Sequence, residues 1–459
     1  MLRYLSFRQF GMIFAEMFLL IGCVFAGYFF HLREVPPTWL ESCFLLGKAV
    51  LIAVIFQVSL HLNDVYNFQG SRFSRDFAFQ LFQGLILANG IIVAFFYIKF
   101  EVIFSRAVLA YSLVLGDILV IIWHTILYRY LNDWSPHTNL LILGTSGLAG
   151  EIVKELKQHP ELGIQIIGFV DDDSACDGIP SVDRKIIGGY EDLAKIVAAY
   201  NVNQIVVGLR DRRGKLPVKE LLELRTKGIA IDDATNFYER ITGKIPIENL
   251  KPGWLIFGGG FEFSKRVLLE KRIFSLVISS VLLVLTSPII LLTMILIKLD
   301  SKGPVFYRQE RVGLNGRTFM LVKFRSMRQD AEQGSGPVWS VAGDSRVTRV
   351  GRILRRTRID ELPQFYNVFR GEMSLVGPRP ERPYFVKQLS EEIPYYPLRH
   401  AVRPGITGWA QIKYQYASTL EHTIEKLQYD LFYIKNSSWV LDTIIVFETI
   451  KTVLVRQGS

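Results

Sequence analysis

Long apolar segments alternate with short polar ones over residues 1–131. Four apolar runs each approach the roughly 20 residues that a helix needs to cross a bilayer. They extend over Phe10–Phe30, Ser42–Leu60, Phe77–Ile98 and Ala107–Tyr128. The pattern therefore predicts a membrane α-helical amino-terminal bundle of four spans. The first run is longer than a signal-peptide core and three more follow it, so we expect it to stay attached.

Three charged residues, Glu16, Lys48 and Asp117, fall inside these apolar runs. Charge within a membrane helix marks a transport path in some proteins, and in others it is paired inside the bundle or near its ends. Both interpretations stay open. The basic residues of the loops are biased weakly to one side, which favours cytoplasmic termini for the bundle.

A fifth apolar run, Ile273–Ile297, differs from the others because Ser287 and Pro288 interrupt it. Proline removes a helical hydrogen bond and clashes with the preceding turn, so we expect a sharp bend. Both flanks are rich in lysine and arginine, and such flanks favour the cytoplasmic side. The sequence predicts a re-entrant helix over 273–297 that enters and leaves one leaflet. A kinked ordinary span is the alternative.

Residues 132–260 have the pattern of a soluble α/β domain. Apolar strands alternate with helical segments, as parallel βαβ units require. The predicted strands are Asn139–Leu143, Gln165–Val170 and Gln204–Val207, and the predicted helices are Glu151–Gln158 and Tyr190–Tyr200. This order predicts a Rossmann-like, doubly wound sheet.

The first predicted strand is followed by a turn that contains Gly144, Gly147 and Gly150, and Asp171–Asp173 follow the second strand. Such glycines can let a phosphate approach the amino terminus of a helix. The spacing is GxxGxxG, however, and dinucleotide sites have GxGxxG. A nucleotide site and a packing turn in a domain used for regulation or assembly are both consistent with it.

Composition narrows the classes of protein and partner. Half of the 459 residues are hydrophobic, which argues against a purely soluble, disordered or fibrous chain. Lysine and arginine exceed the acidic residues by 53 to 43, and the net charge of +10 suggests an anionic membrane surface, a phosphorylated substrate or nucleic acid. Three cysteines without a CxxC motif exclude a disulfide framework and a cysteine-based zinc site.

The segment Asp344–Arg382 contains nine arginines and no lysine. A guanidinium binds two phosphate oxygens at once, whereas lysine acts as a point charge. This choice favours a phosphate-binding surface, with a solvated or lipid-headgroup face as the alternative. Nucleic acid is not expected, because the arginines adjoin membrane segments and lack a helix-turn-helix or zinc-finger context.

Two adjacent carboxylates, Asp360 and Glu361, lie within this segment, directly after its first six arginines. Pro363 suits the first turn of a helix, so the pair should lie at a helix amino terminus, where the dipole favours ionised carboxylate. An ionised aspartate among arginines is well placed to bind Mg²⁺ or to attack a phosphorus atom. Helix capping is the alternative.

Five longer motifs stand in order in the carboxy-terminal part. They are KFRSM at 323–327, RVTRVGRILRRTRIDELPQFYNV at 346–368, GEMSLVGPRP at 371–380, RPGITGWAQI at 403–412 and EKLQYDLFYIKN at 425–436. From about Lys265 to the end, the chain resembles the bacterial polyprenyl-phosphate glycosyl-1-phosphate transferases. The bundle and the middle domain are similar to those of the family's large members. The resemblance implies a mostly α catalytic domain over 261–459.

The resemblance implies transfer of a sugar 1-phosphate from a UDP-sugar to undecaprenyl phosphate with release of UMP, which initiates exopolysaccharide, capsule or O-antigen synthesis. Asp360 is implied as the nucleophile, Glu361 as its partner, and Mg²⁺ as the cofactor that this pair binds. Ser287 and Pro288 match the family's break in its re-entrant helix. The residues expected to bind phosphate or substrate are Lys323, Arg325, Arg355, Arg379, Arg403 and Asp430.

The implied location is the cytoplasmic membrane of a bacterium, with the catalytic domain facing the cytoplasm. Membrane lipid and a second copy of the chain, in a homodimer, are the expected partners. One departure concerns Ser275, because the family usually has an aspartate after Lys-Arg-x-Phe. Arg403–Trp409 either binds uridine or forms a packed loop. Trp439–Val455 predicts an amphipathic surface helix whose wet side carries Asp442, Glu448 and Lys451.

Two other functions compete with this one. A membrane-bound nucleotide-sugar dehydratase or epimerase would use the glycine turn for NAD chemistry, which normally needs a lysine four residues after a tyrosine. None of the 19 tyrosines has one. A non-enzymatic scaffold of polysaccharide assembly would leave the carboxylate pair and the arginine run without a purpose.

Overall fold

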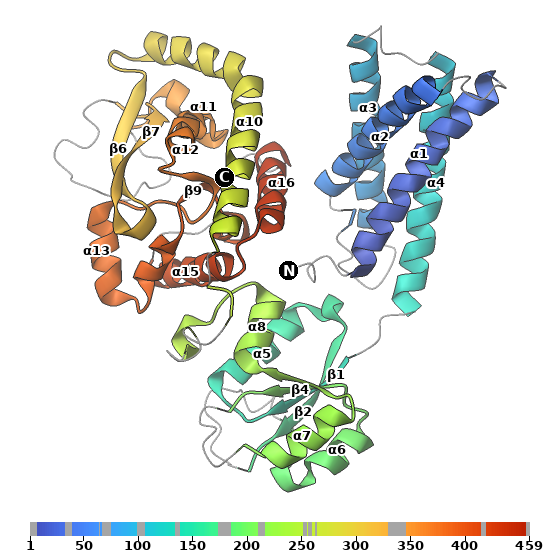
Figure 1. The fold of residues 1–459 in the computed structure, drawn as a ribbon, viewed down its shortest axis with the longest axis vertical. Helices are drawn as coiled ribbons and strands as arrows, with labels where there is room; N and C mark the ends of the chain where they lie inside the picture. The colour runs from blue at the N-terminus through green and yellow to red at the C-terminus, as the bar shows by residue number, and fades with distance from the viewer. Residues whose placement is uncertain are drawn as a thin grey trace.

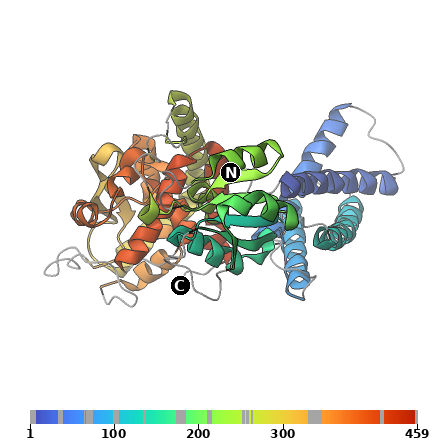
Figure 2. The same ribbon diagram turned by 90° about the horizontal axis from the view of Figure 1, so that it is seen from below.

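The computed structural model of the chain has three parts (Figure 1). It describes all residues except 1–6, 33–38, 64, 67–74, 99–105, 134–137, 173–184, 210–215, 251–254, 256–258, 262–263, 329–345, 415–418 and 456–459. Asp173 lies outside the described residues. Figures 1 and 2 place a helical bundle and a carboxy-terminal unit on opposite sides of the molecule, and Figure 1 shows the sheet of the middle domain below both.

The four amino-terminal apolar runs form long helices, as predicted. They are α1 (Phe7–Leu32), α2 (Trp39–Leu62), α3 (Arg75–Ile98) and α4 (Arg106–Asp133). Each contains a stretch that is long and apolar enough to cross a membrane. Their inward faces form one core that includes Leu60 and Ile92, while large side chains such as Phe30 and Phe82 are exposed. An apolar outer surface of this extent is typical of a membrane protein.

Two of the charged residues inside these helices are paired within the bundle. Glu16 is fully buried, and its Oε2 accepts a hydrogen bond of 2.8 Å from the Tyr66 hydroxyl. Asp117 accepts one of 2.8 Å from the Asn89 amide. These contacts join different helices or their ends, so the carboxylates stabilise the bundle from inside. Lys48 is half-buried on α2.

The middle domain is a five-stranded parallel sheet of order β3-β2-β1-β4-β5. The strands are β1 (Thr138–Leu143), β2 (Ile164–Val170), β3 (Ile186–Gly188), β4 (Gln204–Val207) and β5 (Ala230–Asp233). Helices α5 (Gly147–Gln158) and α8 (Ala234–Thr242) cover one face, and α6 (Leu193–Ala199) and α7 (Val218–Thr226) cover the other. The Rossmann-like prediction is confirmed, although β3 and β5 were not foreseen.

Helix α10 (Lys265–Asp300) contains the fifth apolar run in one 36-residue helix with Pro288 inside it. At 1.5 Å per residue it would extend about 54 Å, longer than a bilayer core of about 30 Å. Figure 1 shows it rising beside the carboxy-terminal unit and then turning across the top. The proline leaves the carbonyl of Val284 without its usual partner. The Ser287 hydroxyl donates to that carbonyl at 2.8 Å, so the serine replaces the bond that the proline removes.

The carboxy-terminal unit is mostly helical, as predicted. An antiparallel hairpin, β6 (Phe306–Val312) and β7 (Thr318–Phe324), precedes the helices. The remaining main elements are α11 (Arg349–Arg356), η7 (Ile359–Gln364), α12 (Phe365–Arg370), β8 (Ser374–Val376), α13 (Pro383–Glu392), η8 (Tyr396–Ala401), β9 (Gly405–Thr407), α14 (Trp409–Lys413), α15 (Leu420–Lys435) and α16 (Trp439–Val455). Strands β8 and β9 form a short parallel pair.

The segment that links the middle domain to α10 packs into the carboxy-terminal unit. Ile245 and Ile247 are buried in the same core as residues of α14 and α15. The Trp409 indole donates to the carbonyl of Gly243 at 3.0 Å, and the Ile245 amide donates to that of Gln428 at 3.2 Å. This core therefore begins well before α10.

Helix α16 corrects one sequence prediction. Asp442, expected on the wet side, is fully buried. Its Oδ1 accepts a hydrogen bond of 2.8 Å from the Tyr433 hydroxyl and lies 3.3 Å from the Lys271 ammonium of α10. The amphipathic pattern could not reveal a buried lysine on another helix. Glu448 is half-buried and lies 3.4 Å from His61 at the end of α2.

Candidate active site

Asp360 and Glu361 lie at the start of η7, a 3₁₀ turn between α11 and α12. The hydroxyl of Thr348 caps α11 by accepting a hydrogen bond of 2.9 Å from the third amide beyond it. The chain turns again at Arg358, whose φ of 59° lies in the left-handed region. The carboxylates thus start a helical turn, as expected, but Pro363 lies inside a 3₁₀ turn and does not open an α-helix.

Glu361 is held by several cations. Its Oε1 lies 2.6 Å from Arg379 Nη2, 3.7 Å from Arg358 Nη1 and 3.9 Å from Lys323 Nζ. Burial alone would raise the pKa of Glu361, but Arg379 and Lys323 outweigh burial and lower that pKa to about 2. Glu361 is therefore ionised, and its ion pairs fix its orientation.

Asp360 is also buried, but one of its carboxylate oxygens has no hydrogen-bond partner in the described part of the chain. Its Oδ1 is shielded from solvent and accepts no hydrogen bond from any described residue. Burial and the charge of Glu361 raise the pKa of Asp360 to about 6, against the opposing charges of Lys323 and Arg379. A buried carboxylate oxygen without a partner reduces stability, so its presence points to a ligand or a reaction.

Lys323, Arg355 and Arg379 come together around this pair, as expected. Burial lowers the pKa of Lys323, on β7, to about 8. Glu361 raises the pKa of Arg379, in the loop after β8, and keeps it charged. The charge of Arg355, near the end of α11, lowers the pKa of Asp360. Three elements distant in sequence thus supply cations to one buried pair.

Asp430 acts on this site through a residue that the sequence analysis missed. Its Oδ2 accepts a hydrogen bond of 2.9 Å from Arg399, and that arginine also donates to the backbone carbonyl of Arg379 at 3.0 Å. Arg399 binds the Tyr396 hydroxyl as well, at 2.6 Å. Asp430 thus holds the Arg379 loop. Arg399, four residues before the RPGITG motif, gave no sequence signal, because its role depends on its contact with α15.

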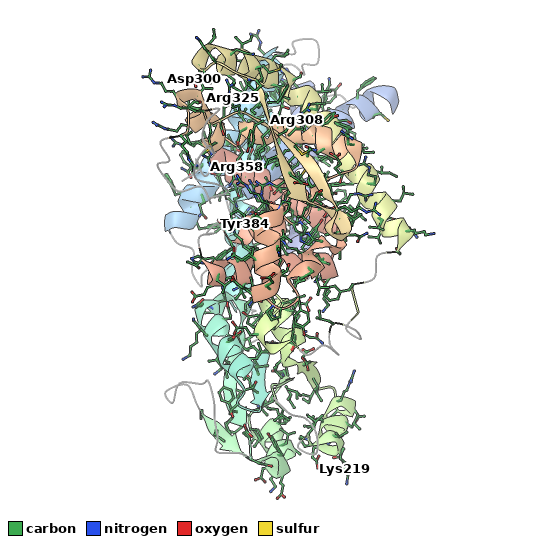
Figure 3. The ribbon with its side chains drawn as sticks, turned by 90° about the vertical axis from the view of Figure 1, so that its left-hand side faces the viewer. Lys219, Asp300, Arg308, Arg325, Arg358 and Tyr384 are labelled. Atoms are coloured by element: carbon green, nitrogen blue, oxygen red, sulfur yellow. The ribbon has the colours of Figure 1, made fainter. Side chains whose placement is uncertain are left out.

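Arg325 and Arg403, expected at the phosphates, bind the chain elsewhere. Arg325 donates to the carbonyls of Ser301 and Lys302 at 2.7 and 2.9 Å. Figure 3 shows it close to Asp300, at the end of α10. Arg403 donates to the carbonyl of Gly371 at 3.0 Å. In the described part of the chain neither forms an ion pair with the carboxylates, so these arginines fix the ends of α10 and α12.

Known proteins resemble this chain in the same regions. Residues 265–456 match the family described as bacterial sugar transferase, and residues 61–225 match the CoA-binding domain family. One relative is the UDP-glucose:undecaprenyl-phosphate glucose-1-phosphate transferase of Escherichia coli. It is 32% identical over 317 residues, which cover 68% of this chain and 67% of the relative. The chain belongs to the bacterial sugar transferase family.

Two further relatives match smaller shares of their own lengths. The UDP-N-acetylgalactosamine-undecaprenyl-phosphate N-acetylgalactosaminephosphotransferase of Aeromonas hydrophila is 47% identical over 221 residues, 48% of this chain and 51% of the relative. The undecaprenyl-phosphate glucose phosphotransferase of Komagataeibacter xylinus is 34% identical over 325 residues, 69% of this chain and 59% of the relative. The chain thus spans about half to three fifths of these two proteins.

In the glycine turn of the middle domain, the polar groups that could contact a nucleotide bind one another instead. Asp171 Oδ2 accepts hydrogen bonds from the amide and the hydroxyl of Thr145, at 2.9 and 2.7 Å, and its Oδ1 accepts one of 3.0 Å from the Tyr190 hydroxyl. Gly144 has a φ of 91°, and a Cβ there would lie 2.9 Å from Leu209. Gly147 and Gly150 lie in the first turn of α5. These contacts favour a packing turn.

The Arg403–Trp409 segment of the sugar transferase is a packed loop. A Cβ on Gly405 would lie 2.1 Å from the amide of Gly377, so these two backbones cross at close range. The buried Trp409 ring stacks on Phe432 with centroids 5.9 Å apart. Of the two interpretations of this motif, the contacts support the structural one.

Ser275, where the resemblance led us to expect an aspartate, contacts strand β8. Its hydroxyl lies 2.9 Å from that of Ser374 and accepts a hydrogen bond of 3.3 Å from the amide of Leu375. Both partners belong to β8, which leads into the Arg379 loop. Helix α10 is therefore tied to the strand that positions a cation of the site.

The carboxylate pair fits a magnesium ion. Mg²⁺ prefers oxygen ligands and is commonly held by one or two carboxylates together with substrate phosphates. The buried, unpartnered Oδ1 of Asp360 is an oxygen of the required kind. In the described part of the chain, no group of three or more His, Cys, Asp or Glu residues could enclose a metal ion by itself. A metal here would therefore depend on the substrate for further ligands.

Proposed function

We propose that this sugar transferase moves a sugar 1-phosphate from a UDP-sugar to undecaprenyl phosphate, as the names of its relatives describe for them. The observation that carries the proposal is the contrast within the carboxylate pair. Glu361 is fixed by Arg379 at 2.6 Å, while Asp360 keeps a buried oxygen without a partner. Such an oxygen is available for nucleophilic attack.

In the first step an oxygen of the Asp360 carboxylate attacks the phosphorus that carries the sugar. A bond forms between this oxygen and phosphorus, the bond from phosphorus to the bridging oxygen breaks, and UMP leaves with the electron pair. Lys323 and Arg379 neutralise the negative charge of the transferring group, which is the main requirement of phosphoryl transfer. Glu361 orients both cations by its ion pairs.

In the second step an oxygen of the lipid phosphate attacks the same phosphorus. The bond between phosphorus and Asp360 breaks, the carboxylate is restored, and undecaprenyl-diphosphate-sugar is released. No proton has to be removed from either nucleophile, because both are anions. The reaction therefore needs positioning and charge neutralisation more than acid-base catalysis.

Asp360 and Glu361 are the residues that would hold Mg²⁺. The ion would supply positive charge against the diphosphate of the substrate. Asp360 offers the unpartnered oxygen, and the ionised Glu361 lies beside it.

The shape of α10 supports a re-entrant arrangement. Helix α10 turns in Figure 1 and contains Pro288, and its flanks are basic at both ends. A helix that returns to its own leaflet would keep the catalytic unit on the cytoplasmic side of a bacterial membrane, where UDP-sugars are made. A Lys302→Cys variant labelled from the periplasm would show a true span instead.

A nucleotide-sugar dehydratase or epimerase is not favoured. Asp171, which could contact a nucleotide, already accepts hydrogen bonds from Thr145 and Tyr190. UMP release decides between the two activities. Purified protein with Mg²⁺ and undecaprenyl phosphate should release UMP from one of a panel of UDP-sugars, and absorbance of a bound nicotinamide cofactor without UMP release would contradict the proposal.

A further inference from the structure

The candidate site holds more positive charge than its carboxylates neutralise. Among the described residues, four carboxylates influence this region: Asp360, Glu361, Glu381 and Asp430. Eight cations do so: Arg311, Lys323, Arg355, Arg358, Arg379, Arg382, Arg399 and Lys426. Partly buried cations in excess destabilise a fold unless an anion joins them. The excess predicts an anionic ligand, and Arg311 has no role yet.

Arg311 lies on the site face of the β6–β7 hairpin. Tyr307 is directly opposite Lys323, and residues two and four apart on a strand share a face, so Arg311 and Lys323 share one. Arg311 Nη1 donates to the carbonyl of Pro380 at 3.2 Å, and the next amide of β6 donates to that of Glu381 at 2.9 Å. The end of β6 is thus tied to the residues just after Arg379.

The guanidinium of Arg311 has donors to spare. Its Nη2 donates to Gln309 at 2.7 Å, and Glu381 Oε2 lies 3.6 Å from Nη1. Its Nε is buried and has no hydrogen-bond partner among the described residues. A guanidinium carries five N–H donors in a planar fork that matches two phosphate oxygens. A phosphate group is the ligand that would satisfy both the charge and the geometry.

Arg311 lies beside two other cations of the site, Lys323 on the same hairpin face and Arg379 just before the Pro380 that it contacts. The cations whose charges most affect Asp360 are Lys323, Arg379 and Arg355. Arg311 interacts with Lys323 and Arg379 instead. The shared hairpin face and the contact with Pro380 thus put Arg311 where it can bind a phosphate together with Lys323 and Arg379.

The reaction itself requires one phosphate position to be used twice. In an in-line displacement the attacking and leaving oxygens lie on opposite sides of phosphorus. Asp360 enters on one side, so UMP leaves on the other. The lipid phosphate must later attack opposite Asp360, which is the position that UMP has vacated. Two different phosphate monoesters therefore occupy the same subsite in turn.

We propose that Arg311, beside Arg379, forms this shared subsite and binds the phosphate of UMP as it leaves and that of the lipid as it arrives. The inference rests on the proposed function and adds a residue and an order of occupancy to it. Arg311 would stabilise charge on the departing phosphate in the first step and orient the acceptor in the second. A lysine could supply the charge but not the two-pronged contact.

The test compares Arg311→Gln and Arg311→Lys with Arg308→Gln in the full chain. Arg308 is exposed and lies on the opposite face of the same strand (Figure 3). Its substitution by glutamine removes the same charge as Arg311→Gln. Three quantities are measured for each: UMP affinity, the rate of UMP release from UDP-sugar alone, and the rate at which undecaprenyl phosphate discharges the preformed adduct. The melting temperature reports folding.

We expect Arg311→Gln to weaken UMP binding and to slow both half-reactions by about 100-fold each, the effect of losing a charge-assisted contact in a buried site. Arg311→Lys should recover about tenfold of this, and Arg308→Gln should stay within about twofold of the wild type. If Arg311→Gln does not fold, Arg311→Lys decides by the same measurements. UMP should also compete with undecaprenyl phosphate.

Two results would overturn the inference. One is a set of Arg311 variants whose UMP affinity and half-reaction rates match those of Arg308→Gln. The other is a loss confined to UMP release, with normal discharge by the lipid, because the subsite would then not be shared. A wild type that releases no UMP would refute the proposed function instead. UMP and inorganic phosphate binding would still test Arg311, since only a loss in the Arg311 variants supports the subsite.

Discussion

Two aspartates differ in how far their carboxylate oxygens are hydrogen-bonded: Asp171, just after strand β2, and Asp360, at the start of the η7 turn. Asp171 of the middle domain accepts three hydrogen bonds, two from Thr145 and one from Tyr190. Asp360 of the carboxy-terminal unit is buried beside Glu361 with one oxygen unpartnered. A satisfied carboxylate stabilises the fold around it, whereas an unsatisfied one is kept for a ligand. The difference separates a structural turn from a reactive site.

The largest expected effect separates the two aspartates by activity. Asp360→Asn should reduce UMP release by about 10⁴-fold or more, the size typical of losing a nucleophile. Asp171→Asn should leave release per folded molecule within about twofold, because its contacts lie within the middle domain. Steady-state UMP release from both variants, corrected for folded protein, makes the comparison. Equal losses in the two would break the contrast.

The next effect is on the stability of carboxy-terminal fragments, and it shows at which residue the catalytic unit begins. A fragment of residues 243–459 keeps Ile245 and Ile247, which are buried in the core of that unit, whereas a fragment of residues 265–459 loses them. Burial of two isoleucines contributes about 3–6 kcal/mol, so the shorter fragment should unfold at lower temperature. Both are compared in detergent by thermal unfolding and by UMP release.

We expect the longer fragment to release UMP at a rate per folded molecule close to that of the full chain, since it keeps every described residue of the site. The fragment lacks Asp171 entirely. A folded 243–459 fragment without activity would show that the middle domain contributes to the chemistry, and the contrast between the two aspartates would then fail.

A smaller effect concerns the free energy of unfolding, which Asp360→Asn and Asp171→Asn should change in opposite directions. Burial raises the pKa of Asp360 from 3.8 to about 6, so the folded state binds the extra proton between these values and loses stability as pH rises through them. Above pH 6 the ionised Asp360 therefore destabilises the fold, by about 3 kcal/mol. Without divalent metal, Asp360→Asn should be more stable than the wild type at pH 7.5 and equal to it below about pH 4.

Asp171→Asn should change stability in the opposite direction. The amide can keep part of the hydrogen bonding but faces donors with an NH₂ group, so we expect a loss of about 1–3 kcal/mol. Thermal unfolding of both variants in EDTA, at several pH values, measures this. Loss of stability in both at neutral pH would mean that Asp360 is also structural.

The smallest expected effect concerns the hydrogen bond from Tyr190 to Asp171 in the middle domain. Tyr190→Phe removes one of the three hydrogen bonds to Asp171 and leaves the two from Thr145. We expect a loss of about 1 kcal/mol, with UMP release unchanged. Chemical denaturation of the full chain detects it, and Tyr200→Phe, an exposed tyrosine of the same domain, is the matched control.

The sequence allowed prediction of features that depend on local pattern. Apolar length located α1 to α4, and alternating strands and helices located most of the sheet. Lys323, Arg355 and Arg379 were expected near Asp360, and they are. That expectation came from the motifs. The residue spacing alone did not decide between helix capping and a reactive site for Asp360 and Glu361, or between phosphate binding and a solvated face for the arginines.

Features that depend on distant contacts could not be foreseen. Asp442 was placed on a wet surface because its helix is amphipathic, yet Lys271 and Tyr433 surround it. Arg325 lies in a phosphate-site motif, but its donors bind the carbonyls that end α10. Arg399 lies between the GEMSLVGPRP and RPGITGWAQI motifs and donates a hydrogen bond to the backbone carbonyl of Arg379. Each of these depends on which element packs against which, and a single sequence does not contain that information.

The most direct test is the intact mass of the protein after incubation with UDP-sugar and Mg²⁺ but no lipid acceptor. If Asp360 is the nucleophile, the wild type gains the mass of one sugar phosphate, the added group maps to the peptide that contains Asp360, and undecaprenyl phosphate removes it. Asp360→Asn gains nothing, while Asp171→Asn behaves as the wild type. An unmodified wild type that still turns over, or an adduct that forms on Asp360→Asn, would contradict the assignment.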